Sequence, residues 1–289
     1  MNRRRFLAIT AAAAGMAGRA GAGTVWQGRA FGADCRISLT GPRDRAEAVL
    51  DALPRLIAGI EGQFSLHDPQ SVLSRLNATG QGRDLPAPFV AVLRVADAVH
   101  RATGGAFDPT VQSVWEALAA GRSAPAEVVG WHRVTIGETV VLGQGQKLTL
   151  NGIAQGYAAD AVRALIAAEG FTEALVDLGE TATLGGNWEI GIADPVAGVI
   201  GKRRLVGTAM SVSSPRATLV RGHPHIIHPA GKAAIWSSVA VEAETATLAD
   251  ALSTALVFLN GDEIRNVQAG FPGIRSVTLI DAGGNLSSL

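Results

Sequence analysis

Cysteine and aromatic residues are scarce in this chain of 289 residues, and neither sign of charge is in excess. The one cysteine, Cys35, excludes an internal disulfide and any metal cluster built on several thiolates. Because 25 Lys and Arg balance 25 Asp and Glu, no basic field exists to meet a nucleic-acid backbone. Hydrophobic residues reach 47%, aromatic residues only 5%, and glycines number 35. We therefore expect a sizeable core of Ala, Val and Leu, linked by tight turns.

No hydrophobic run reaches the length of a membrane span. The apolar stretch at residues 9–18 is about half of the ~20 residues that a spanning helix needs. It follows Arg3 and Arg4 and precedes an Ala-x-Ala site that ends at Ala22, which is typical of a twin-arginine export signal. An N-terminal membrane anchor is the alternative. We predict that residues 1–22 are this signal, that residues 23–289 form the mature domain, and that the protein is periplasmic, where a single cysteine is best buried.

Helical and strand patterns follow each other irregularly along the mature chain. Apolar residues recur at helical spacing over residues 44–64, 86–103, 154–169 and 247–259. Strands are expected within residues 25–39, as hairpins over 131–150, and at 175–176, 188–192, 207–212, 235–241 and 277–280. Because strict βαβ alternation is missing, these elements predict an α+β fold. We expect one compact domain of mixed, short-stranded sheets with flanking helices.

Two glycine-containing segments could bring the backbone close to a ligand. In GGAFDPT, residues 104–110, Asp108 suits either an N-cap before Pro109 or the wall of a ligand site. In NGIAQGYAAD, residues 151–160, a strand ends in a turn that opens a helix, and free N–H groups there attract anions. This second segment matches neither a Walker A loop nor a dinucleotide fingerprint. A plain glycine turn is its alternative.

Three of the six histidines lie within HPHIIHP, residues 223–229. Three imidazoles so close in sequence could bind a transition metal. In a strand, however, His223 and His225 would lie on one face and His228 on the other. A three-histidine site is therefore geometrically awkward and remains an alternative.

Asp250 and Thr254 are four residues apart in a predicted helix, so their oxygens lie on one helix face. A carboxylate, a hydroxyl and nearby carbonyls form an oxygen set that suits Mg²⁺ beside a phosphate. The alternative is structural, with Asp250 interacting with the helix dipole and Thr254 bonded to its own helix.

Five segments in order resemble the motifs of the ApbE family, the FAD:protein FMN transferases. GAFDPT at residues 105–110 and DALSTA at 250–255 match the family motifs outright. GIAQGYAAD at 152–160 is similar to Gly-Ile-Ala-Lys-Gly-Tyr-Ala-x-Asp. HIIHPAG at 225–231 is similar to His-Ile-Ile-Asp-Pro-x-x-Gly with one residue fewer, and the block 64–77 resembles Phe-Ser…Ser-x-hydrophobic-Ser-x-hydrophobic-Asn. The resemblance runs across nearly the whole mature chain.

The resemblance implies an enzyme that moves the FMN half of FAD onto a Ser or Thr hydroxyl and releases AMP. The acceptor would be a flavoprotein subunit of a membrane redox complex. Asp250 and Thr254 would hold Mg²⁺, with backbone oxygens of Gly152 and Ser253 beside them. His225 falls on the family's essential histidine and would be the base that activates the hydroxyl. The family's FAD contacts fall on Phe31, Ala106, Phe107, Asp108, Gln155 and Ile226.

Several positions depart from the family pattern, and they concern the flavin pocket more than the metal ligands. They are Gln155 for Lys or Glu, Thr149 and His228 for Asp, and Glu180 and Ser214 for Gly. Two other functions therefore stay open: an FAD-binding protein without transfer, and an FAD pyrophosphatase that uses water as acceptor. The retained metal pair and histidine favour chemistry over storage. Self-flavinylation is not expected, because the chain lacks the acceptor pattern Asp-x-x-Ser/Thr-Gly-Ala-Ser/Thr.

Overall fold

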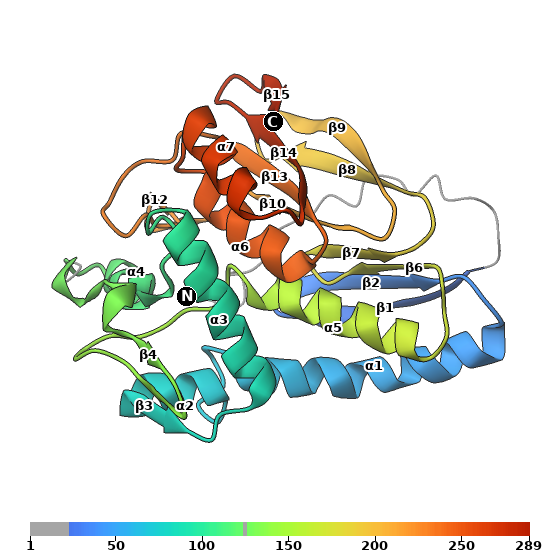
Figure 1. Cartoon of the computed structure of the whole chain (residues 1–289), viewed down its shortest axis with the longest axis horizontal. Helices are drawn as coiled ribbons and strands as arrows, with labels where there is room; N and C mark the ends of the chain where they lie inside the picture. The colour runs from blue at the N-terminus through green and yellow to red at the C-terminus, as the bar shows by residue number, and fades with distance from the viewer. Residues whose placement is uncertain (1–22, 124–125) are drawn as a thin grey trace.

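An eight-stranded antiparallel sheet organises the computed structural model, which describes residues 23–123 and 126–289 (Figure 1). The predicted export signal at residues 1–22 lies outside the described residues. In spatial order the strands are β1 (Thr24–Ala30), β2 (Ala33–Leu39), β6 (Ala174–Asp177), β7 (Thr181–Leu184), β10 (Ala209–Ser213), β13 (Ser238–Ala243), β14 (Ile274–Ile280) and β15 (Leu286–Ser288). Strands distant in sequence, such as β2 and β6, are therefore neighbours.

Helices pack on one face of this sheet, with α5 on β6 and β7, α6 on β10 and β13, and α1 beside α5 (Figure 1). The helices are α1 (Arg43–Phe64), α2 (Val72–Thr79), α3 (Ala87–Ala102), α4 (Gln112–Ala119), α5 (Ala154–Ala168), α6 (Ala246–Leu256) and α7 (Gly261–Gly270). The four helices predicted from periodicity are confirmed as α1, α3, α5 and α6. The α+β fold of mixed sheets with flanking helices is likewise confirmed.

Smaller sheets lie around the main one. They are β3 (Gln81–Arg83), β5 (Thr139–Val141) and β4 (Thr135–Ile136), then the ribbon of β8 (Trp188–Asp194) and β9 (Gly198–Leu205), and the pair β11 (Leu219–Val220) and β12 (His223–Pro224). The prediction of hairpins over residues 131–150 is only partly correct. A 3₁₀ turn occupies Trp131–Arg133, the β4–β5 hairpin follows, and the rest of the segment forms no strand. That last stretch is bonded to other elements instead, for example through the side chain of Asn77 in α2 to the backbone of Leu148.

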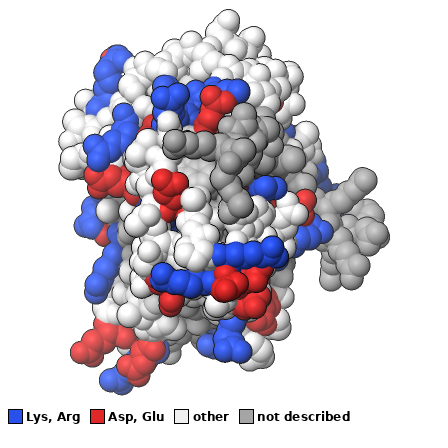
Figure 2. Space-filling view, turned by 90° about the vertical axis from the view of Figure 1, so that its right-hand side faces the viewer, with Lys and Arg blue, Asp and Glu red and all other residues white. Residues whose placement is uncertain are grey.

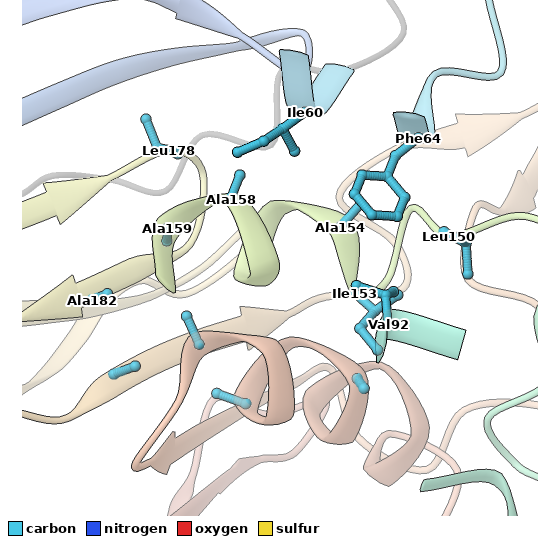
Figure 3. Close-up of a cluster of buried hydrophobic side chains, with 14 of the residues drawn as sticks. Ile60, Phe64, Val92, Leu150, Ile153, Ala154, Ala158, Ala159, Leu178 and Ala182 are labelled. Carbon is cyan, nitrogen blue, oxygen red and sulfur yellow. The ribbon is translucent and has the colours of Figure 1, made fainter. Parts of the chain in front are cut away.

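Helix α5 runs through a cluster of buried hydrophobic side chains (Figure 3). Its Ala158 and Ala159 are fully buried, because small side chains let α5 lie close to α1 and α6. At its N-terminal end, Phe64 of α1 stacks on Phe89 at 5.5 Å and meets the edge of Tyr157 at the same distance. This packing fixes the first turn of α5, on which the candidate site depends.

Gly156 in the first turn of α5 has no room for a side chain. A Cβ there would lie 2.2 Å from the Ala246 carbonyl oxygen and 2.8 Å from Cβ of Asp250. We expect Gly156→Ala to destabilise the fold by about 3 kcal/mol, because α5 and α6 would have to move apart. Gly59→Ala is the matched control, since a Cβ on this exposed position of α1 meets nothing within 4 Å. Urea unfolding should show Gly59→Ala stabilised by about 0.5–1 kcal/mol, and equal effects of the two changes would contradict the prediction.

The surface carries both signs of charge side by side. Figure 2 shows one face on which Lys and Arg side chains stand beside Asp and Glu rather than gathering into a patch of one sign. None of the described helices is both long and apolar enough to span a membrane. Cys35 is 4% exposed, and burial raises the pKa of its thiol to about 11, so it is held as an unreactive thiol.

Candidate functional site

A cavity of about 950 Å³ opens between the main sheet, the first turn of α5, helix α6 and the β8–β9 ribbon. All but two of the predicted site residues lie in its wall. They are Ala106, Phe107, Asp108, Gly152, Gln155, His225, Ile226, Asp250 and Thr254. Segments separated by as much as half of the chain therefore meet around one space.

Phe31 and Ser253 do not line this cavity. Phe31 lies in the β1–β2 turn with φ of 50°, where its N–H donates to Oε1 of Glu61 at 2.7 Å, and its ring packs against the core. Ser253 is fully buried behind the wall, and its hydroxyl lies 2.8 Å from those of Ser211 and Ser213. The predicted contact of Phe31 with FAD and that of the Ser253 backbone oxygen with Mg²⁺ therefore stay predictions.

The oxygen donors predicted for a metal come together where α5 and α6 meet. Oδ2 of Asp250 accepts a hydrogen bond of 3.0 Å from the Gly156 N–H. A Cβ on Gly152 would lie 2.8 Å from Oγ1 of Thr254, so the turn before α5 lies directly against that hydroxyl. A buried carboxylate, a hydroxyl and neighbouring backbone fit a hard divalent cation such as Mg²⁺.

Asp177 and Glu180 line the same wall, and burial disfavours the charge on both of them and on Asp250. Burial raises the pKa of Asp250 to about 7, with a further contribution from Asp160. Burial raises the pKa of Asp177 to about 6. The pKa of Glu180 is raised well above its usual value by burial and then by Asp250 and Asp177. A bound cation would relieve this mutual repulsion.

The raised pKa of Asp250 predicts a pH-dependent cost to the fold. Since its pKa is about 7 in the folded state and 3.8 ordinarily, the folded state holds the extra proton between these values, and stability falls as pH rises through that window. We expect Asp250→Asn, which cannot ionise, to gain stability relative to wild type from about pH 4 to about pH 8 in a chelator, reaching about 8 °C in melting temperature. A difference that stays constant or shrinks over this range would contradict the assignment.

His225 follows the β11–β12 hairpin with its ring held by two backbone carbonyls. Nδ1 lies 3.0 Å from the Pro215 oxygen and 3.2 Å from the Thr218 oxygen. Because carbonyl oxygens only accept, Nδ1 carries the proton and Nε2 is left as a free base. Burial lowers the pKa of His225, which keeps the ring neutral at pH 7. The cavity wall therefore contains an imidazole ready to accept a proton.

The other two histidines of the cluster do not join His225. Nδ1 of His228 accepts from the Ala230 N–H at 2.9 Å, and its ring meets the edge of Phe258 at 5.0 Å. His223 is exposed in β12. Within residues 23–123 and 126–289, no group of three or more His, Cys, Asp or Glu is arranged to hold a metal. The three-histidine arrangement is thus not formed.

Asp108 is the N-cap that its sequence context allowed. Oδ1 accepts from the N–H and the hydroxyl of Thr110 at 2.8 and 2.6 Å, and Oδ2 accepts from the Trp131 N–H at 3.2 Å. Its carboxylate therefore holds the cavity wall together. Gln155 is similarly engaged, since Nε2 donates to the Leu178 carbonyl at 3.3 Å.

Among the cavity residues that the sequence did not single out as functional, Asp177, Glu180, Arg36 and Asp194 carry charge. Glu180 was noted only as a departure from the family pattern. Arg36 of β2 lies opposite Asp177 in the strand register, and its buried Nε has no hydrogen-bond partner within the described part of the chain. Asp194 at the end of β8 accepts hydrogen bonds from two serine hydroxyls. No local pattern identifies these residues, because each gains its meaning from neighbours distant in sequence.

Comparisons with known proteins show which fold and family the chain shares. The structure is similar to the ApbE protein of Thermotoga maritima, with a TM-score of 0.81 and 26% identity over 92% of this chain and 96% of that one. It also resembles the flavin transferase ApbE of Vibrio cholerae (TM-score 0.78, 20% identity, 92% and 97% covered) and the flavinyl transferase ApbE of Pseudomonas stutzeri (TM-score 0.77, 20% identity, 92% and 95% covered). A sequence search of curated proteins gave no match. The sequence profile of the ApbE family matches residues 31–278, and the chain therefore belongs to the ApbE family.

Proposed function

We propose that this protein is an FAD:protein FMN transferase. It takes FMN from FAD, attaches it to a Ser or Thr hydroxyl of an acceptor flavoprotein, and releases AMP, in a reaction that depends on Mg²⁺. One observation carries the proposal: a neutral histidine with a free Nε2 lies in the same cavity wall as the buried carboxylate of Asp250 and the half-buried hydroxyl of Thr254. The cavity of about 950 Å³ is large enough for a dinucleotide. Two structurally similar proteins are named flavin or flavinyl transferases.

The chemistry is a phosphoryl transfer between two oxygens. Nε2 of His225 takes the proton of the acceptor hydroxyl as that oxygen bonds to the FMN phosphorus. The bond from this phosphorus to the bridging oxygen breaks, and AMP leaves with that oxygen. Positioning and charge compensation dominate such a step.

Charge explains why a cation is required. The diphosphate of FAD is anionic, and Asp177, Glu180 and Asp250 line the same cavity. Without a cation these groups would repel each other. Asp250 and Thr254 would hold Mg²⁺ beside the diphosphate, where the ion supplies the positive charge that stabilises the leaving phosphate.

The first prediction of this function is flavin binding. We expect the mature protein to quench FAD fluorescence on titration. Its affinity for FAD should be lower than with the family's Lys or Glu at position 155, because the Gln155 amide is bonded to the Leu178 carbonyl. Absence of quenching at about 100 μM, equivalent to binding weaker than roughly 5 kcal/mol, would contradict the flavin assignment.

The decisive assay separates transfer from the two alternatives. The protein is incubated with FAD, Mg²⁺ and a peptide of the pattern Asp-x-x-Ser/Thr-Gly-Ala-Ser/Thr, and the products are measured by mass. We expect a peptide heavier by FMN less one water, together with AMP. Free FMN and AMP without modified peptide would indicate a pyrophosphatase, and bound but intact FAD would indicate a storage protein.

We also propose that the protein acts in the periplasm after export by the twin-arginine route, on a subunit of a membrane redox complex. The support is the paired Arg3 and Arg4, the apolar stretch at residues 9–18 and the Ala-x-Ala site. Cell fractionation that recovers the mature protein only in the cytoplasm would contradict this location.

A further inference from the structure

Asp194, at the end of β8, is a buried carboxylate with four hydrogen-bond donors. Oδ1 accepts from the N–H groups of Val196 and Ala197 at 2.8 and 2.9 Å. Oδ2 accepts from the hydroxyls of Ser237 and Ser238, both at 2.6 Å. Burial acts to raise the pKa of Asp194, but these hydrogen bonds outweigh it and lower the pKa, so the group is an anion at neutral pH. An anion held this firmly can fix the direction of the hydrogen bonds that reach it.

The hydrogen bond from Ser238 to Asp194 also fixes the direction of the hydrogen bond between Ser238 and Ser214. The two hydroxyls lie 2.6 Å apart, and each has a single proton. Because Ser238 donates to Asp194, it can only accept from Ser214. The hydroxyl of Ser214, which lines the cavity, therefore points its proton away from the cavity toward Ser238.

Ser214 begins the loop that holds the ring of His225. The next residue is Pro215, whose carbonyl and that of Thr218 both accept from Nδ1 and from the backbone N–H of His225. The loop closes on itself through Ala217, whose N–H donates to the Ser214 carbonyl at 2.9 Å. Pro215 has no N–H with which to fix its own position. The side chain of Ser214 thus bonds the start of this loop to β13, one residue beyond the last β10–β13 pair, Ser213 and Val239.

We propose that Asp194, Ser238 and Ser214 are positioning residues that fix the tautomer and orientation of His225. The relay keeps the two carbonyls in place, the carbonyls keep the proton on Nδ1, and Nε2 stays free. Its effect on catalysis depends on the proposed transferase function, whereas its effect on the tautomer does not. Ser214 is one of the positions at which this chain departs from the family pattern.

Ser237 and Ser238 offer a matched pair for the test. Both donate to the same oxygen of Asp194 at the same distance, but only Ser238 is bonded onward to Ser214. We expect Ser238→Ala to lower kcat about 10-fold or more with the Kd for FAD within about 2-fold, and Ser237→Ala to leave both within about 2-fold. In ¹⁵N NMR of labelled histidine, the His225 signal should show protonated Nδ1 in wild type and Ser237→Ala, and mixed tautomers in Ser238→Ala.

Ser214→Ala provides an independent route to the same result and carries the test if Ser238→Ala does not fold. It should mix the tautomers as Ser238→Ala does, and the double variant should lose no more than either single change. Equal loss in Ser237→Ala and Ser238→Ala, or an unchanged tautomer in both Ser238→Ala and Ser214→Ala, would overturn the proposal. If wild type transfers no FMN, the proposed function fails, and the NMR comparison still decides the relay.

Discussion

Replacing His225 by alanine is expected to abolish FMN transfer while FAD still binds. The ring nitrogen that faces its own loop is protonated, so Nε2 is the proton acceptor that this part of the cavity offers. Loss of a general base costs about 10²–10⁴-fold in rate. We expect kcat to fall at least about 10²-fold, measured by mass of the flavinylated peptide, with fluorescence titration showing the Kd for FAD within about 3-fold of wild type.

The neighbouring histidines provide the controls for this change. His223 is exposed and outside the cavity wall, so His223→Ala should cost little. His228→Ala removes the acceptor of the Ala230 N–H and the ring that meets Phe258, and should therefore act through the shape of the loop. Equal damage from all three substitutions, together with stoichiometric zinc in the wild type, would overturn the proposed mechanism.

Periodicity was sufficient for the longer helices α1, α3, α5 and α6 and insufficient for the shorter ones, α2, α4 and α7. Helix α7 has little apolar character, yet it begins with a capping box in which Asn260 and Glu263 exchange hydrogen bonds, a signal that its sequence does contain. Strand β9 was not predicted, because three consecutive charged residues interrupt its apolar pattern. Lys202 pairs with Glu189 across the ribbon at 2.6 Å and Arg203 reaches Thr278, while Ile200 and Leu205 pack into a small apolar cluster, so the apolar pattern of this strand is too sparse to predict it.

The order of the motifs predicted which segments meet, but not which atoms are free to act. Asp108 belongs to one of the family motifs, yet both of its carboxylate oxygens are occupied by hydrogen bonds from Thr110 and Trp131. Conversely, nothing near Glu180 in sequence indicates that its carboxylate is buried, or that its pKa is raised by Asp250, which lies 70 residues further along the chain. Hydrogen bonds and charges between distant segments decide such roles, and a local pattern contains no record of them.

Replacing Asp250 is expected to remove Mg²⁺-dependent transfer while the protein still folds. Its carboxylate is the charged member of the predicted ligand set, and a divalent cation needs that charge. We expect Asp250→Ala to lower transfer at least about 10²-fold and to abolish the rise in melting temperature that Mg²⁺ gives the wild type. Thermal melts with and without Mg²⁺, beside the peptide assay, provide both measurements.

Asp250→Asn separates the ligand role from the structural one. An amide keeps an oxygen to accept from the Gly156 N–H, which alanine cannot do, but it has no charge. Because burial disfavours the charged carboxylate, the Asn variant should melt at or above the wild-type temperature in a chelator at pH 8 and still be inactive. If the Asn variant instead melts lower at that pH, or retains full Mg²⁺-dependent turnover, Asp250 serves the junction of α5 and α6 rather than the metal. A stable but inactive variant would show that the carboxylate binds the cation. If the role of Asp250 were purely structural, its replacement would lower the stability of the protein before it lowered turnover.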